Sequence, residues 1–185
     1  WNAGQMAAAE DFVAREEPLE IRVRGRSVAI TMRTPGHDDE LAAGFLLTEG
    51  LVRERGDITE IAHCTLGEAA ELRNVINVFV APRLEIDFDQ LTRHVFASSS
   101  CGLCGKATID GVHQHFPPVT AKLSVSSKTL LELPVKLRSA QKVFEQTGGL
   151  HGVGMFDTAG ERVVSREDVG RHNAVDKVIG HGLLN

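Results

Sequence analysis

Alternation of apolar and polar residues near the start of the chain predicts a β-hairpin. Between Leu19 and Met32, apolar residues occupy every second position on both sides of Gly25. A period of two is typical of a strand with one buried face. The same alternation recurs over residues 74–80 and 84–88, where we expect further strands.

Apolar residues three and four positions apart predict helices elsewhere. The first is expected over about residues 36–49, because Thr34 and Pro35 suit a helix start and Gly50 suits a stop. The later elements are expected in this order: a short strand near residues 123–125, a helix capped by Ser127, a helix over 139–147, a hairpin around residues 157–160, and a last helix capped by Asp168 and ended by Gly180.

These patterns mix strands and helices and predict an α/β (α+β) fold. We expect an N-terminal α+β unit with the hairpin over residues 1–95 and a second unit over residues 119–185. Residues 96–118 between them have no hydrophobic periodicity and contain clustered serines and glycines, so we expect a mobile surface loop there.

The composition of the chain argues against several classes of function. Twenty basic residues against 25 acidic ones give a net charge of -5, which argues against broad nucleic-acid binding. The chain has no tyrosine and one tryptophan, so we do not expect a base-stacking platform for single-stranded nucleic acid. No run of about 18 apolar residues is present, so no membrane span is expected. The first residues lack the features of a signal peptide, and we expect a cytoplasmic protein.

The expected loop carries two thiols, Cys101 and Cys104, in the run Ser-Ser-Ser-Cys-Gly-Leu-Cys-Gly. Such a pair is redox-active, sulfur-carrying or half of a metal site. Zinc remains an alternative, since His113 and His115 follow, although their spacing departs from the usual ligand pattern. A thioredoxin-like motif fits the flanking serines and glycines poorly. The third cysteine, Cys64, is expected to behave as a small buried hydrophobe.

A second polar cluster lies near the end of the chain. Glycines flank His151, and the segment from Glu167 to Lys177 holds seven polar or ionisable side chains in eleven positions. Amides at a helix start attract anions, and arginine binds phosphate through two parallel hydrogen bonds. The segment therefore predicts a nucleotide- or phosphate-binding pocket. A capped surface helix with salt bridges is the alternative.

Four motifs in this order resemble one family: Arg-Thr-Pro-Gly-His-Asp-Asp-Glu-Leu-Ala-Ala-Gly-Phe-Leu-Leu-Thr-Glu-Gly from Arg33, Ser-Ser-Cys-Gly-Leu-Cys-Gly from Ser99, Thr-Gly-Gly-Leu-His from Thr147, and Glu-Asp-Val-Gly-Arg-His-Asn-Ala-Val-Asp-Lys from Glu167. The chain resembles the formate dehydrogenase accessory sulfurtransferases, the FdhD family, over residues 17–180.

The resemblance implies a sulfurtransferase that accepts persulfide sulfur from an L-cysteine desulfurase. It implies transfer of this sulfur to a molybdenum or tungsten bis(guanine dinucleotide) pterin cofactor, which formate dehydrogenase needs for activity. The first thiol of the pair, Cys101, would carry the persulfide and Cys104 would assist by exchange. No permanently bound metal is expected.

The second polar cluster fits this resemblance as the cofactor pocket, lined by His151, Asp168, Arg171, His172 and Asn173. The resemblance also implies a homodimer and, over residues 119–185, a mixed sheet with helices of the cytidine deaminase fold. Family members continue beyond the last helix, so we expect this unit to be incomplete at its C-terminus. Deaminase chemistry is not expected, because no Glu stands two residues after His151.

Two alternatives stay open. One is a non-catalytic, cofactor-binding chaperone of formate dehydrogenase, in which the thiols are incidental. The other is an interaction module stabilised by zinc, which would unfold when a chelator removes the metal.

Overall fold

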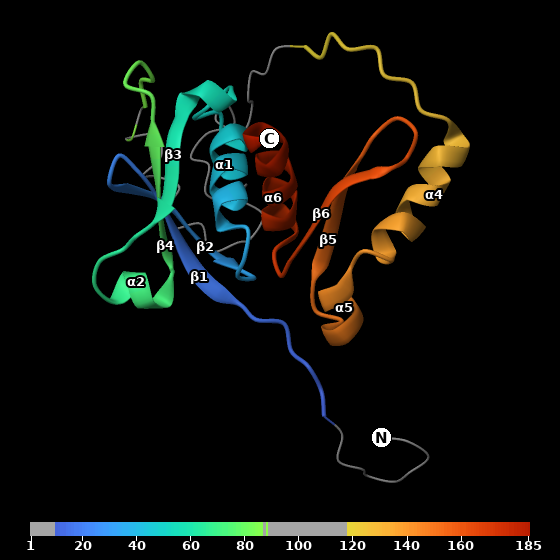
Figure 1. Ribbon diagram of the computed structural model, residues 1–185, viewed down its shortest axis with the longest axis horizontal. Coiled ribbons are helices and arrows are strands. Elements are labelled where there is room, and N and C mark those ends of the chain that lie inside the picture. The colour runs from blue at the N-terminus through green and yellow to red at the C-terminus, as the bar shows by residue number, and fades with distance from the viewer. Residues whose placement is uncertain (1–9, 87, 89–117) are drawn as a thin grey trace, which may run out of the picture.

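The computed structural model describes residues 10–86, 88 and 118–185 (Figure 1). The predicted loop over 96–118, and with it Cys101, Cys104, His113 and His115, lies outside these residues except for residue 118. The division into units at this loop stays a prediction.

The N-terminal part forms a four-stranded mixed sheet with the strand order β2-β1-β4-β3. Strand β1 pairs antiparallel with β2 and parallel with β4, and β3 pairs antiparallel with β4. The strands are β1 (Glu17–Val23), β2 (Arg26–Arg33), β3 (Ile58–His63) and β4 (Val75–Val80), with the single turn η1 (Arg55–Asp57) before β3 and the short helix α2 (Glu68–Leu72) before β4.

The predicted N-terminal hairpin is confirmed. Arg24 and Gly25 connect β1 to β2, and both have positive φ, 50° and 77°. Two-residue turns of this kind match the right-handed twist of the paired strands, and glycine adopts such a φ without steric cost. Leu19 and Ile21 point to the covered face of the sheet and are buried in the core.

Two helices cover one face of this sheet. Helix α1 (Asp38–Thr48) and helix α6 (Arg171–Leu184) pack against each other between the four-stranded sheet and a second, two-stranded sheet (Figure 1). The main core lies between β1, β2, β4 and α1, where Leu41 and Leu46 meet the apolar strand residues. Because α6 comes from the end of the chain, the two parts predicted from the sequence share this helical layer.

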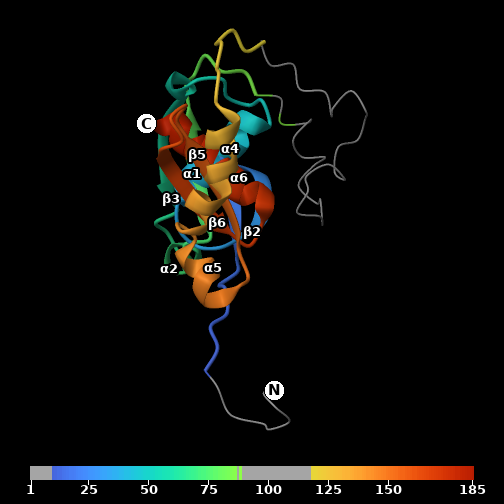
Figure 2. The same cartoon turned by 90° about the vertical axis from the view of Figure 1, so that its right-hand side faces the viewer.

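Strands β5 (His151–Phe156) and β6 (Arg162–Asp168) form the two-stranded antiparallel sheet. Helices α4 (Ser127–Arg138) and α5 (Lys142–Thr147) lie on its other side (Figure 2). Among the residues that the structure describes, β5 and β6 pair only with each other, so the mixed sheet lies in the N-terminal part and not in the C-terminal one.

The α+β class is confirmed, and most predicted elements are present with shifted ends. The strand expected near residues 123–125 is wrong, because residues 118–126 have no regular structure. No strand forms over 84–86 either. The last helix does not end at Gly180 but continues to Leu184, and its N-cap is Gly170, not Asp168. Likewise, Ser126 caps α4 by accepting a hydrogen bond from Thr129 N at 3.0 Å.

Helices α1 and α6 approach closely because each has a glycine at the crossing. A Cβ atom built at Gly44 would overlap the carbonyl oxygen of Asp176, and one built at Gly180 would overlap the carbonyl oxygen of Glu40. Only a residue without a Cβ atom lets two helix backbones come this near. The two glycines therefore set the distance between the sheet and the β5–β6 hairpin.

At the same crossing, Asp176 is held partly buried against α1, where Thr48 Oγ1 donates to its Oδ1 at 3.0 Å. Burial raises the pKa of this carboxyl from 3.8 to about 7, helped by the nearby charge of Glu49 and opposed by the Thr48 hydrogen bond. The folded protein thus binds this proton more tightly than the unfolded chain does.

We expect the free energy of unfolding to fall between about pH 4 and pH 7 and then to level off, because unfolding releases the Asp176 proton in this range. The loss is at most on the order of 4 kcal/mol. Asp176→Asn should remove most of this slope, as measured by urea unfolding at several pH values. The exposed Glu60→Gln should keep the slope. A slope unchanged in Asp176→Asn would contradict the role of this carboxyl.

Candidate functional site

A buried ion pair lies at the N-terminal end of α1. Arg33, the last residue of β2, is 1 % exposed, and its Nε and Nη2 donate to Asp38 Oδ1 and Oδ2 at 2.9 and 3.0 Å. Arg33 Nη1 reaches Glu17 Oε2 at 3.2 Å, and His63 Nε2 lies 3.3 Å from Asp38 Oδ2. A two-point contact of this kind fixes the orientation of the Arg33 and Asp38 side chains. Together with His63, the pair connects β2, β3 and α1 at this point.

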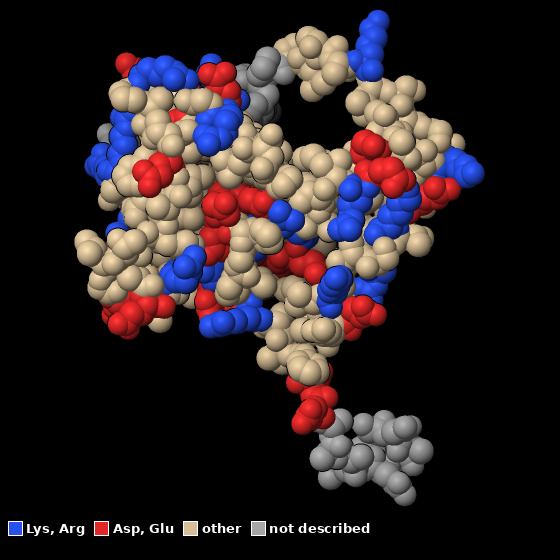
Figure 3. Space-filling view, in the orientation of Figure 1, with Lys and Arg blue, Asp and Glu red and all other residues tan. Residues whose placement is uncertain are grey.

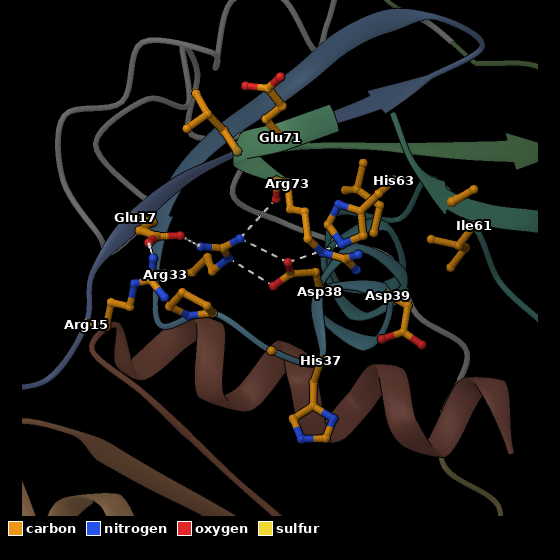
Figure 4. Close-up of a pocket in the computed structure, with 15 residues that line it drawn as sticks. Arg15, Glu17, Arg33, His37, Asp38, Asp39, Ile61, His63, Glu71 and Arg73 are labelled. Carbon is orange, nitrogen blue, oxygen red and sulfur yellow. Dashed lines mark hydrogen bonds and ion pairs between the residues drawn. The ribbon is translucent and has the colours of Figure 1, made fainter. Parts of the chain in front are cut away.

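A pocket of about 500 Å³ opens over this ion pair (Figure 4). The segment from Pro35 to Asp39 forms one wall, β3 another and the end of α2 a third. The lining combines apolar residues on β3, α2 and β4 with charged residues. Clefts of this size with a few convergent polar groups are the usual form of small-molecule sites.

A second ion cluster joins α1 to the hairpin and to α6. The Arg166 guanidinium of β6 donates to both Glu40 oxygens at 2.5 and 2.6 Å, and His181 Nδ1 lies 2.9 Å from Glu40 Oε1. Burial alone would raise the pKa of Glu40, but the hydrogen bonds from Arg166 and His181 outweigh it and lower the pKa below its usual value. Glu40 is therefore an anion at neutral pH, and it connects α1 to β6 and α6.

His37 lies between this cluster and the pocket, and it also borders a smaller cavity of about 250 Å³ beside β6 and α5. Its backbone is left-handed, with φ of 57°, and its side chain does not cap α1. Burial and the positive charge of Arg166 lower the pKa of His37, against the opposing charge of Glu40. The imidazole is thus neutral at pH 7 and faces solvent at the junction of two cavities.

The polar segment after β6 forms a buried network with the chain before α1. Lys177 Nζ lies 2.7 Å from Asp168 Oδ2 and donates to Thr34 O at 2.8 Å, with both charged side chains at most 1 % exposed. Thr34 N donates to Asp168 Oδ2 at 3.1 Å, and Thr34 Oγ1 accepts from Val169 N at 3.1 Å. The network thus joins Thr34, before α1, to the end of β6 and to α6, which are far away in the sequence.

The structure brings the predicted binding residues to one end of the β5–β6 hairpin. His151 stands opposite Asp168 in the strand register, and both Arg171 and His172 are exposed at the start of α6. Asn173 is turned inward, since its Nδ2 donates to Met32 O at 2.7 Å and to Asp168 Oδ1 at 3.1 Å. Their role in binding stays a prediction, although Asp168 and Asn173 are largely occupied by contacts within the chain.

Sequence reasoning missed the residues around the pocket, above all Arg33, His63 and Arg73. The signal that could have found part of the site is the run of three acidic residues in the first turn of α1, which begins five residues after Arg33. Asp38 binds the buried Arg33, and Glu40 binds the partly buried Arg166. Within residues 10–86, 88 and 118–185, no group of three His, Cys, Asp or Glu is arranged to hold a metal ion.

The model of the FdhD/NarQ family matches residues 14–185. The chain is 50 % identical over 185 residues to the sulfur carrier protein FdhD of Mycolicibacterium paratuberculosis, covering 98 % of this chain and 68 % of the relative. The chain belongs to the FdhD/NarQ family. The FdhD protein of Streptomyces coelicolor is 46 % identical over 187 residues, which cover 98 % of this chain and 66 % of that protein. The chain thus spans about two thirds of the length of these relatives.

A solved structure supports the fold. A candidate formate dehydrogenase accessory protein from Desulfotalea psychrophila aligns with a TM-score of 0.69 and 26 % sequence identity, covering 94 % of this FdhD/NarQ chain and 62 % of the neighbour. In the part of the chain that the structure describes, no helix is long and apolar enough to cross a membrane.

Proposed function

We propose that this chain acts as a sulfur carrier that formate dehydrogenase needs for activity. The observation that carries this proposal is its close similarity, 42 to 50 % identity, to proteins named sulfur carrier protein FdhD. The Cys101 and Cys104 pair supplies the chemistry, although it lies outside the described residues. We place the protein in the cytoplasm, where such thiols stay reduced.

In this proposal an L-cysteine desulfurase is the donor. The thiolate of Cys101 attacks the outer sulfur of the donor persulfide, so that one S–S bond breaks, another forms and the donor leaves as a thiolate. Cys104 assists by exchange with Cys101. The acceptor is the bis(guanine dinucleotide) cofactor of molybdenum or tungsten, which enters as substrate and is passed on to formate dehydrogenase.

The cofactor is proposed to bind beside the start of α6. Arg171 and His172 are exposed there, next to His151 at the start of β5. Because the buried Asp168 and the partly buried Asn173 connect the start of α6 to β2 and the chain after it, their contribution is to position this surface. A homodimer is also proposed, on the resemblance to the family alone.

Intact-protein mass spectrometry tests the sulfur-carrying step. After incubation with a cysteine desulfurase and L-cysteine, we expect a mass gain of one or more sulfur atoms that dithiothreitol reverses. Cys101→Ala should lose the gain completely. Cys64→Ala should keep it, because Cys64 is not part of the Cys101–Cys104 pair in the sequence and its thiol, directly after β3, donates to Leu66 O at 3.6 Å.

No mass gain in a folded, reduced and metal-free sample would contradict the proposal. The cofactor-binding chaperone would then become the better interpretation. Stoichiometric zinc, with unfolding by a chelator, would instead favour the zinc-stabilised module.

A further inference from the structure

One cation in the pocket over the Arg33–Asp38 pair has no partner among residues 10–86, 88 and 118–185. The guanidinium of Arg73 extends from the end of α2 toward Asp38 and His63 (Figure 4). Across the residues that the structure describes, this guanidinium makes no hydrogen bond or ion pair. An arginine directed into a pocket with all five N–H donors unused is suited to bind an oxyanion through two parallel hydrogen bonds.

The backbone of Arg73 is fixed in place. Its φ is 48°, and its carbonyl oxygen accepts a hydrogen bond from the buried Arg33 at 3.2 Å. Arg33 is itself held by Asp38 and Glu17. Binding an anion therefore requires only the side chain of Arg73 to be ordered, which keeps the entropy cost low.

Two of the four acidic residues that line the pocket are neutralised by arginines. Glu17 faces Arg15 at 2.5 Å and Arg33 at 3.2 Å, and Asp38 is bound to Arg33 through both oxygens. The Glu71 carboxylate points away from Arg73 (Figure 4). Asp39 is the remaining carboxylate at the rim, and it opposes anion binding.

The start of α1 adds positive potential. The first hydrogen bond within this helix runs from Leu41 N to His37 O, and no side chain caps the helix. The free amides of the first turn and the helix dipole favour a negative charge beside them. On the face shown in Figure 3, by contrast, acidic and basic side chains are intermixed.

We propose that this pocket binds a small molecule through an oxyanion, a phosphate or a carboxylate, which the Arg73 guanidinium holds. A volume of about 500 Å³ admits a molecule well beyond the anion itself, and Ile61, Leu72 and Ile76 provide apolar surface for the rest of it. The site is separate from the residues at the start of α6 and does not depend on the sulfur-carrying role.

Titration calorimetry on the whole chain tests this site, with pyrophosphate and citrate as probes at constant ionic strength. We expect at least one probe to bind with one site per chain, and the preferred probe identifies phosphate or carboxylate as the group recognised. Arg73→Gln should weaken binding at least tenfold, and Arg73→Lys should weaken it less. Asp39→Asn should strengthen binding several-fold, because it removes the opposing charge.

The matched control is Arg53→Gln, which removes one positive charge from an exposed arginine beyond the other end of α1. It should bind the probe as the unmodified chain does. Melting curves without ligand verify that each variant is folded. Failure of both probes to bind, or equal affinity in folded Arg73→Gln, would overturn the proposal, whereas the mass-spectrometric test of Cys101 would be unaffected.

Discussion

Lys177→Met is expected to lower the free energy of unfolding by about 3–5 kcal/mol. The substitution keeps the length of the side chain but removes the ammonium that lies 2.7 Å from the Asp168 carboxylate. Asp168 is fully buried, so water cannot replace the lost charge. Three N–H donors remain, from Thr34, Gly170 and Asn173, but they do not neutralise a buried anion. Urea unfolding followed by circular dichroism measures the change.

Lys136→Met is the matched control for this variant. Lys136 also forms an ion pair, with Glu161 at 2.9 Å, but at the surface, where solvent screens the interaction. We expect its unfolding midpoint to move far less. The double variant Lys177→Met with Asp168→Asn should recover part of the loss, because no buried charge is then left unpaired. Equal midpoints for Lys177→Met and the unmodified chain would show that the buried pair does not hold the fold.

Elements that depend on local pattern were predictable from the sequence. The hairpin β1–β2 needed only alternation and a turn at Gly25, and the hairpin β5–β6 formed around the turn at residues 157–160 as expected. Helix α1 was predicted within two residues of its observed ends. In each case the decisive residues are close in sequence, so periodicity and turn chemistry suffice.

Interactions between distant residues were not predictable in this way. Thr34 was expected to cap α1, but its amide and hydroxyl bind Asp168 and Val169, more than 130 residues later. Asp168 was expected to cap α6, and its carboxylate instead accepts from Lys177 and Thr34. Both side chains were expected to bond with nearby backbone amides at a helix start. In the folded protein they bond with residues of other elements instead.

The pocket was missed for the same reason. Arg33, His63 and Arg73 are separated by 30 and 10 residues, and only the pairing of β3 with β4 beside β1 brings them to the same end of the sheet. Strand β3 was itself not predicted, since its six residues, Ile-Thr-Glu-Ile-Ala-His, lack regular alternation. By contrast, the cofactor-binding residues near α6 could be proposed because many polar side chains stand in one short segment, which the sequence shows directly.

Gly44→Ala is the second substitution with a large expected effect, a loss of about 3 kcal/mol or more in the free energy of unfolding. The added methyl group would meet the backbone of Asp176, which has no rotamer to move away. Alanine favours a helix over glycine by at most about 1 kcal/mol, so the overlap outweighs the gain in helix propensity. Thermal unfolding should show a clearly lower midpoint.

Gly56→Ala serves as the control, because a Cβ atom there meets only side-chain atoms at 3.7 Å. Unchanged stability of Gly44→Ala would mean that α1 and α6 can move apart without cost. Such movement would also separate Thr48 from Asp176 and Glu40 from His181, because the same two helices carry these contacts. The close crossing at Gly44 and Gly180 therefore does more than pack the core. It keeps the start of α1, with its pocket, in register with the start of α6, where the cofactor is proposed to bind.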